Sequence, residues 1–198
     1  MASGQYFDAD PTVASRPGRV TPTLPDPSLD LREDRGVFSA GRIDPGTLAL
    51  LRAERHTPSH GHLLDLGCGY GPLAATLATR APGATIWAVD VNRRAVELTA
   101  ANAAELGLGN IRACVPGDVP PDVRFTAVWS NPPIRIGKLA LHDLLRTWLS
   151  RLRPDGVAHL VVHKHLGGDS LSAWLHGEGW DVERTASKQG YRLLRVAP

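Results

Sequence analysis

The stretch Asp-Leu-Gly-Cys-Gly-Tyr-Gly at residues 65–71 decides how this chain folds. It follows the mostly apolar run 62–64 and precedes a second apolar run, 72–77, so it lies where a buried strand turns into a helix. Glycines at such a turn let the backbone bend tightly and approach a ligand closely, which a Cβ would prevent. The sequence therefore predicts an α/β domain with a ligand site at this turn.

The spacing of the glycines limits which ligand can bind. Gly67, Gly69 and Gly71 place the third glycine one position too early for the dinucleotide fingerprint G-x-G-x-x-G, and Pro72 suits the first turn of a helix. This argues against a pyrophosphate ligand. The D-x-G-x-G-x-G turn instead resembles motif I of the class I S-adenosylmethionine-dependent methyltransferases, whose cofactor carries an amino acid and no diphosphate. The alternative is a glycine-rich turn that binds nothing.

An acidic residue follows the next predicted strand. Residues 84–90 read as a second buried strand ending in Asp90, about 20 residues past the glycines, where nucleotide-binding α/β folds place the acid that accepts both ribose hydroxyls. We therefore expect Asp90 to bind ribose. Its alternative role is a helix N-cap, but Asn92 is an equally good cap for the helix that runs to Gly107.

The loop Asn131-Pro132-Pro133-Ile134 follows the apolar strand 125–130, at the carboxyl edge of the predicted sheet. An exocyclic amine is a poor nucleophile because its lone pair is conjugated. The Asn131 side-chain oxygen and the Pro132 carbonyl can each accept one N–H and so point that lone pair at a sulfonium methyl group. Pro132 and Pro133 stiffen the loop. The alternative is a turn that only ends a strand.

From about residue 34 to the C-terminus the chain resembles the small-domain methyltransferase family, best understood from bacterial ribosomal small-subunit RNA guanine-N2 methyltransferases. The resemblance implies S-adenosylmethionine as cofactor, with adenine bound after the strand 111–115. It implies these roles: Asp65, Gly67, Cys68, Gly69 and Gly71 for the methionine end, Asp90 with Val91 for ribose, Asp118 with Val119 for adenine, and Asn131 with Pro132 and Pro133 for the acceptor amine. Asn131 is also expected to contact the cofactor. A surface turn is the alternative for Asp118.

The expected substrate-binding residues flank this site. Residues 34–39 and 44–47 resemble the segment that covers the cofactor pocket in the family, where Phe38 would contact the target base or be an ordinary core aromatic. Ile134 stands where many members have Phe or Tyr, so it can pack on a base but cannot stack. Arg135 and Lys138 begin a basic run that suits RNA phosphates, although such a run is also typical of the solvated face of an amphipathic helix.

Composition describes an ordinary globular domain: 42% hydrophobic and 21% charged residues in 198, with a net charge of +2 that does not indicate a polyanion ligand. Cys68 and Cys114 are too few and too far apart for a disulfide framework or zinc. His163 and His165 read as a strand-end pair, and we expect no metal. The chain shows no membrane span or secretory core, which predicts a cytoplasmic protein.

Along the chain, the prolines of residues 1–28 predict a flexible leader, and residues 29–198 a single methyltransferase domain. Within it, residues 29–58 would form a strand pair over 29–43 and a helix capped by Asp44, together covering the cofactor site. The remainder predicts a Rossmann-like seven-stranded, mostly parallel sheet with helices on both faces. An antiparallel C-terminal strand pair, 180–187 and 191–196, would complete it.

The sequence therefore predicts transfer of a methyl group from S-adenosylmethionine to an exocyclic amine, and guanine N2 of 16S ribosomal RNA is the expected acceptor. The expected partner is ribosomal RNA or the small ribosomal subunit, and the expected oligomeric state is a monomer or homodimer. Some relatives have a second, degenerate copy of the fold that helps to bind RNA, whereas 198 residues leave room for one catalytic domain and a tail, so we expect RNA binding to depend on a small surface, an added partner or a dimer. The alternatives are a protein glutamine amide or a small-molecule amine as acceptor, and a non-catalytic RNA-binding or assembly factor.

Overall fold

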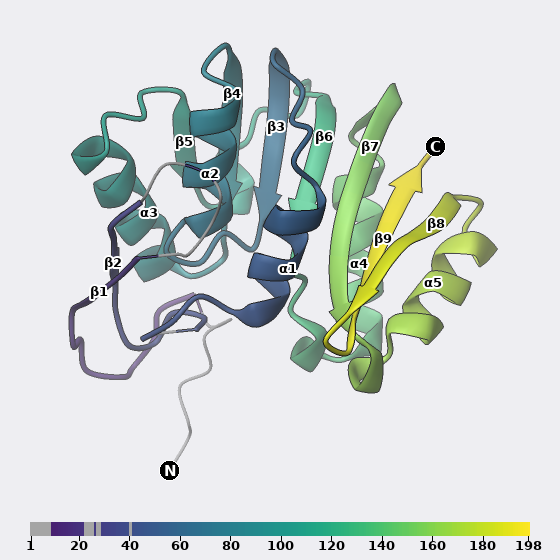
Figure 1. Cartoon of the computed structure of the whole chain (residues 1–198), viewed down its shortest axis with the longest axis horizontal. Coiled ribbons are helices and arrows are strands. Elements are labelled where there is room, and N and C mark those ends of the chain that lie inside the picture. Colours follow the sequence, from purple (N-terminus) through teal and green to yellow (C-terminus); the bar gives the residue numbers. More distant parts are fainter. Residues whose placement is uncertain (1–8, 22–25, 27–28, 40) are drawn as a thin grey trace.

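A seven-stranded sheet in the order β5-β4-β3-β6-β7-β9-β8 forms the centre of the computed structural model, which describes residues 9–21, 26, 29–39 and 41–198 (Figure 1). The pairs among β3 to β7 are parallel, whereas β9 lies antiparallel to both β7 and β8. The strands are β3 Gly61–Leu66, β4 Ala84–Val89, β5 Ile111–Cys114, β6 Phe125–Ser130, β7 Leu152–His163, β8 Asp181–Lys188 and β9 Tyr191–Ala197. The predicted fold class is confirmed.

Helices cover both faces of the sheet, and alternate residues of each strand face different helices. The helices are α1 Pro45–Ala53, α2 Pro72–Arg80, α3 Arg93–Glu105, α4 Lys138–Leu149 and α5 Gly168–Gly177. On β3, Leu63 packs with apolar residues of α1, α2 and α3, whereas Leu64 packs with those of α4 and α5. Burial on both faces explains why the strands read as continuous apolar runs.

Local capping signals set the helix starts. Asp44 accepts hydrogen bonds from the backbone N–H groups of Gly46 and Thr47, with Pro45 at the first position of α1. Asn92 caps α3 in the same way through Ala95. Both predicted caps are confirmed.

The predicted strand pair over residues 29–43 is wrong. The strand β2 Leu31–Glu33 pairs with β1 Gly18–Val20, which lies in the predicted leader, and residues 34–39 and 41–43 contain no second strand. After β2, the Asp34 carboxylate accepts hydrogen bonds from the Ser15 hydroxyl and the Arg16 backbone N–H, which hold the start of this segment against residues 15 and 16. The predicted leader is thus ordered at β1, while its residues 1–8, 22–25 and 27–28 lie outside the described residues.

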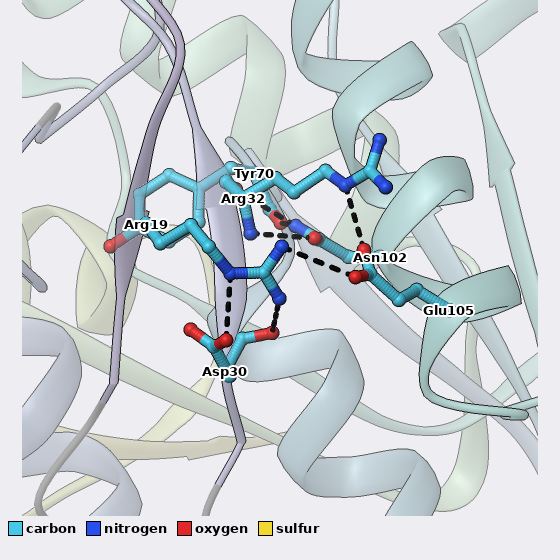
Figure 2. A network of polar contacts seen from close by, with 6 residues as sticks. All are labelled: Arg19, Asp30, Arg32, Tyr70, Asn102 and Glu105. Carbon is cyan, nitrogen blue, oxygen red and sulfur yellow. Dashed lines mark hydrogen bonds and ion pairs between the residues drawn. The ribbon is translucent and has the colours of Figure 1, made fainter.

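A polar network fastens the β1–β2 pair to α3 and to the glycine turn (Figure 2). The buried Asn102 side chain accepts from the Arg32 N–H at 2.8 Å and donates to the carbonyl groups of Arg32 at 3.0 Å and Tyr70 at 2.8 Å. Arg19 and Arg32 also pair with Glu105 at the surface. Exposed ion pairs contribute little, so the buried amide of Asn102 carries most of this attachment.

Candidate active site

Two adjoining cavities open at the carboxyl edge of the parallel strands. The main cavity, about 610 Å³ including its opening to solvent, has mostly apolar walls, among them Val89, Val91, Pro116 and Trp148. The side cavity, about 330 Å³ by the same measure, reaches toward the N-terminal end of α1. Both are lined by Phe38, Gly67 and Asn131, so each cavity borders the glycine turn and the Asn-Pro-Pro loop.

The glycines of the turn serve different purposes. Gly67 has a φ of +79°, and a Cβ added there would meet no atom within 4 Å, because the backbone faces the open cavities. Gly71 has a φ of +91°, but an added Cβ would lie 2.9 Å from the Thr99 hydroxyl. Gly67 therefore leaves room for a ligand, whereas Gly71 allows α2 and α3 to pack closely.

Asp90 lines the main cavity, and two backbone N–H groups hold its carboxylate in a fixed orientation. One oxygen accepts the Gly69 N–H at 2.9 Å and the other accepts the Asn92 N–H at 3.0 Å. Burial raises the pKa of Asp90 above its ordinary value, and these N–H donors oppose that shift. Each oxygen keeps further acceptor capacity, so the geometry is suited to a diol ligand.

Asp65 lies behind the glycine turn and lines neither cavity. It is fully buried, and its Oδ2 accepts the Ala74 N–H at 2.9 Å, which ties β3 to the first turn of α2. Its Oδ1 has no hydrogen-bond partner among the described residues. Burial raises the pKa of Asp65 to about 8, more strongly than the Ala74 N–H lowers it. Asp65 thus supports the turn from within the core.

The N-cap of α1, Asp44, and a residue of its first turn, Thr47, hold the amide of Asn131 in place. The Nδ2 group donates to Asp44 Oδ1 at 2.7 Å and to Thr47 Oγ1 at 3.2 Å. A carboxylate can only accept, so the amide nitrogen must face Asp44 and the amide oxygen must face away from it. Both N–H bonds of Asn131 are engaged, and Oδ1 is the atom left for a substrate donor. Sequence reasoning identified Asp44 as a helix cap and residues 44–47 as part of the segment over the cofactor pocket, but it did not predict the contact of Asp44 and Thr47 with Asn131.

The structure brings some of the other predicted residues to the cavities and leaves others outside. Phe38 lines both cavities, and the buried Cys68 lines the side cavity. Asp118 is exposed at the end of the short 3₁₀ turn η1 Pro116–Asp118, and Val119 is buried in the core, so Pro116 is the residue of this segment at the cavity.

The predicted substrate-binding residues after Asn-Pro-Pro lie at the rim. Ile134 and Arg135 form the 3₁₀ turn η2 Ile134–Ile136, and Lys138 is the first residue of α4. Ile134 is half-buried against the core, while Arg135 and Lys138 are exposed. Leu144 and Trp148 of α4 line the main cavity and were missed, because in sequence they belong to an apolar stripe typical of a core helix.

Within the described part of the chain, no cluster of three or more His, Cys, Asp and Glu side chains could hold a metal ion. The rings of His163 and His165 lie 5.4 Å apart at the end of β7. The helices described here are all too short or too polar to cross a lipid bilayer.

The seven-stranded sheet in this order, with helices on both faces and an antiparallel C-terminal strand pair, is the Rossmann-like fold of the class I S-adenosylmethionine-dependent methyltransferases. Comparison with known protein families shows which family within this class the chain belongs to. The chain belongs to the methyltransferase small domain family, whose model matches residues 28–195.

Relatives of two lengths match the chain. It is 31% identical to the uncharacterized protein YbxB of Bacillus subtilis (strain 168), over 98% of each chain. It is 34% identical to ribosomal RNA small subunit methyltransferase C of Pseudomonas entomophila (strain L48), over 87% of this chain and 52% of the relative. The solved T. thermophilus 16S rRNA N2 G1207 methyltransferase, in complex with AdoMet and guanosine, superposes with a TM-score of 0.78 at 27% identity, covering 94% of this chain and 52% of that one. The chain thus spans about half the length of these methyltransferases.

Proposed function

We propose that this protein transfers the methyl group of S-adenosylmethionine to an exocyclic amine, and that the amine is N2 of a guanine in 16S ribosomal RNA. The observation that carries the proposal is the oriented Asn131 amide, held by Asp44 and Thr47 beside a cavity that also reaches the glycine turn. Two relatives that this chain covers over about half of their length support guanine N2 as the acceptor by their names, one of which is a 16S rRNA N2 methyltransferase.

The residues around the two cavities fit this cofactor. When bound, S-adenosylmethionine supplies an electrophilic methyl group on a positively charged sulfonium. The apolar residues Val89, Pro116 and Trp148 would hold its base, and the Asp90 carboxylate would accept its ribose hydroxyls. The side cavity, with Asp44 and Thr47, would hold its amino-acid end. The unobstructed space above Gly67 is the observation that favours a ligand lying across the turn.

The loop that follows β6 would present the acceptor. Asn131 Oδ1 and the Pro132 carbonyl each would accept one N–H of the amine, which directs the nitrogen lone pair at the methyl carbon. The Pro132 carbonyl already accepts the Ile134 N–H at 2.8 Å and keeps one lone pair for the substrate. No tuned base is required, because the amine proton can leave after the methyl group has been transferred.

Two substitutions test the proposal. Asn131→Ala should lower kcat by at least about 100-fold, as expected for loss of a preorganised transition-state contact, while calorimetry shows unchanged cofactor affinity. Asp90→Ala should instead weaken cofactor binding by about 10-fold or more, since it removes a charged hydrogen-bond acceptor. Full turnover by Asn131→Ala would refute the role of the loop.

The acceptor is identified by incubating the wild-type protein and labelled cofactor with 16S ribosomal RNA, intact small subunits and a protein extract in separate reactions. Nucleoside mass spectrometry should find the label on guanine N2 in one of the two RNA-containing samples. Label on another nucleoside would refute guanine N2, and label confined to the extract would refute an RNA acceptor.

A further inference from the structure

Four cationic residues lie on segments at the carboxyl edge of the sheet, the edge that also carries the loop of residues 131–134, which we call the acceptor loop. Arg135 and Lys138 follow β6, Lys164 lies in the 3₁₀ turn η3 Lys164–Leu166 after β7, and Lys188 ends β8. All four are exposed. Among the described residues, none of their side chains makes a hydrogen bond or an ion pair. We call these four residues the basic edge.

Backbone contacts join two segments of the basic edge, and a shared surface groove joins the third to them. The Lys164 N–H donates to the Gly190 carbonyl at 2.8 Å, and Lys188 pairs with Tyr191 across the β8–β9 turn. Lys138 and Leu166 line the same surface groove, which connects the start of α4 to η3. Figure 1 shows the β8–β9 turn and the segments after β6 and β7 at one edge of the sheet.

The same edge adjoins the site. The Tyr191 ring packs against Gly46 at the start of α1, where an added Cβ would lie only 2.7 Å from a ring carbon. Gly46 donates its N–H to Asp44 Oδ1, the atom that anchors Asn131. The start of β9 is therefore packed against the helix start that holds the acceptor loop, and Lys188 is the strand partner of this Tyr191.

Several other surface arginines have acidic partners. Arg146 of α4 pairs with Glu178 at 2.7 Å, and Arg153 at the opposite edge of the sheet pairs with Asp155 at 3.0 Å. The carboxylate of Asp169, near η3, is engaged by Arg184 at 2.6 Å and Arg192 at 3.3 Å. The four residues of the basic edge thus keep their positive charges without an acidic partner among the described residues, although the whole chain carries a net charge of only +2.

We infer that the basic edge docks the phosphate backbone of the RNA that flanks the methylated base. The inference rests on the proposed function and extends it from Arg135 and Lys138 to Lys164 and Lys188. Exposed lysines without acidic partners favour a polyanion over a protein surface, because lysine is depleted at protein interfaces, whereas phosphate contacts dominate RNA affinity. The exposed His165 beside Lys164 offers a ring on which an unpaired base can stack.

The test compares two double variants that each remove two positive charges. K164Q/K188Q changes the basic edge, whereas R112Q/R124Q changes exposed arginines without acidic partners among the described residues, at the amino ends of β5 and β6 and thus at the opposite edge of the sheet. Fluorescence anisotropy with a short single-stranded RNA of mixed sequence should show about 10-fold weaker binding for K164Q/K188Q and a salt slope smaller by about 1.5, the value for two phosphate contacts. The control should bind as the wild type does, and calorimetry should show equal cofactor affinity for all three proteins.

The binding assay needs no methyl transfer, so its outcome separates the two proposals. Loss of RNA affinity in K164Q/K188Q would support the basic edge even if the wild type methylated no RNA. Wild-type affinity and salt slope in K164Q/K188Q would overturn the basic edge even if the wild type methylated RNA. Equal losses in both double variants would also overturn it, because they would show a response to net charge alone.

Discussion

Replacing Asp44 with serine should separate the two tasks of this carboxylate. Asp44 caps α1 through Gly46 and Thr47, and it also accepts the Asn131 Nδ2 group at 2.7 Å. Serine is about as good an N-cap as aspartate, so the start of the helix should remain. Its shorter, uncharged hydroxyl would not reach the amide of Asn131, and the acceptor loop would lose its main anchor.

The size of the effect follows from that hydrogen bond. A hydrogen bond to a charged group contributes about 1.5–3 kcal/mol, which corresponds to about a 10- to 150-fold loss in kcat if all of it orients the amide. Thr47 Oγ1, at 3.2 Å from Nδ2, would remain as a weaker second anchor. The loss should therefore be smaller than that caused by Asn131→Ala.

The assay combines steady-state methyl transfer to 16S ribosomal RNA with cofactor calorimetry and thermal unfolding. Asp44→Asn is the matched control, because its side-chain oxygen can still cap the helix and accept a hydrogen bond from Asn131. This variant should retain activity within about threefold of the wild type, because it replaces a charged hydrogen-bond acceptor by a neutral one. The double variant Asp44→Ser with Asn131→Ala should be no slower than Asn131→Ala alone. Additive losses in the double variant, or a loss confined to cofactor affinity, would refute the positioning role.

Two further predictions concern the glycine turn and the acid behind it. Gly67→Ala places a side chain at a φ of +79° and into the cavities, so it should cost about 1 kcal/mol of stability and lower cofactor affinity about 10-fold. Gly109→Ala is the control, because Gly109 lies in equally open space without a positive φ, and this variant should change neither quantity much. Burial raises the pKa of Asp65 from 3.8 to about 8, so the folded protein keeps a proton that the unfolded chain has lost over this range. The free energy of unfolding should therefore fall as pH rises from about 5 to 8, and Asp65→Asn should reduce that slope in urea titrations. An unchanged slope would contradict the assignment.

Local signals explain how much of the fold the sequence predicts. The buried strands read as apolar runs because both of their faces are covered, and Asp44 and Asn92 mark the starts of their helices because capping depends on residues only two or three positions away. The position of the glycine turn follows from the same short-range pattern. Each of these features depends on neighbours along the chain, so no knowledge of distant contacts is needed.

The β1–β2 pair shows where such signals end. Each of its strands has only three residues, Gly18–Val20 and Leu31–Glu33, so neither carries enough alternation to identify a partner. On the free edge of β2, the backbone N–H and carbonyl groups of Arg32 form hydrogen bonds with the side chain of Asn102, 70 residues away, rather than with a third strand. Nothing local in residues 29–43 distinguishes this arrangement from a hairpin.

The same limit applies to the candidate site. The sequence predicts which residues form it, but not how the Asn131 amide is oriented. Asn131 and its prolines indicate by their chemistry that an amine can be held, but an amide has two ends, and the sequence does not say which end faces the substrate. Asp44 decides this from 87 positions away, because its carboxylate can accept only the nitrogen end. The residue that caps a helix in the sequence thus becomes, through folding, the residue that orients the acceptor loop.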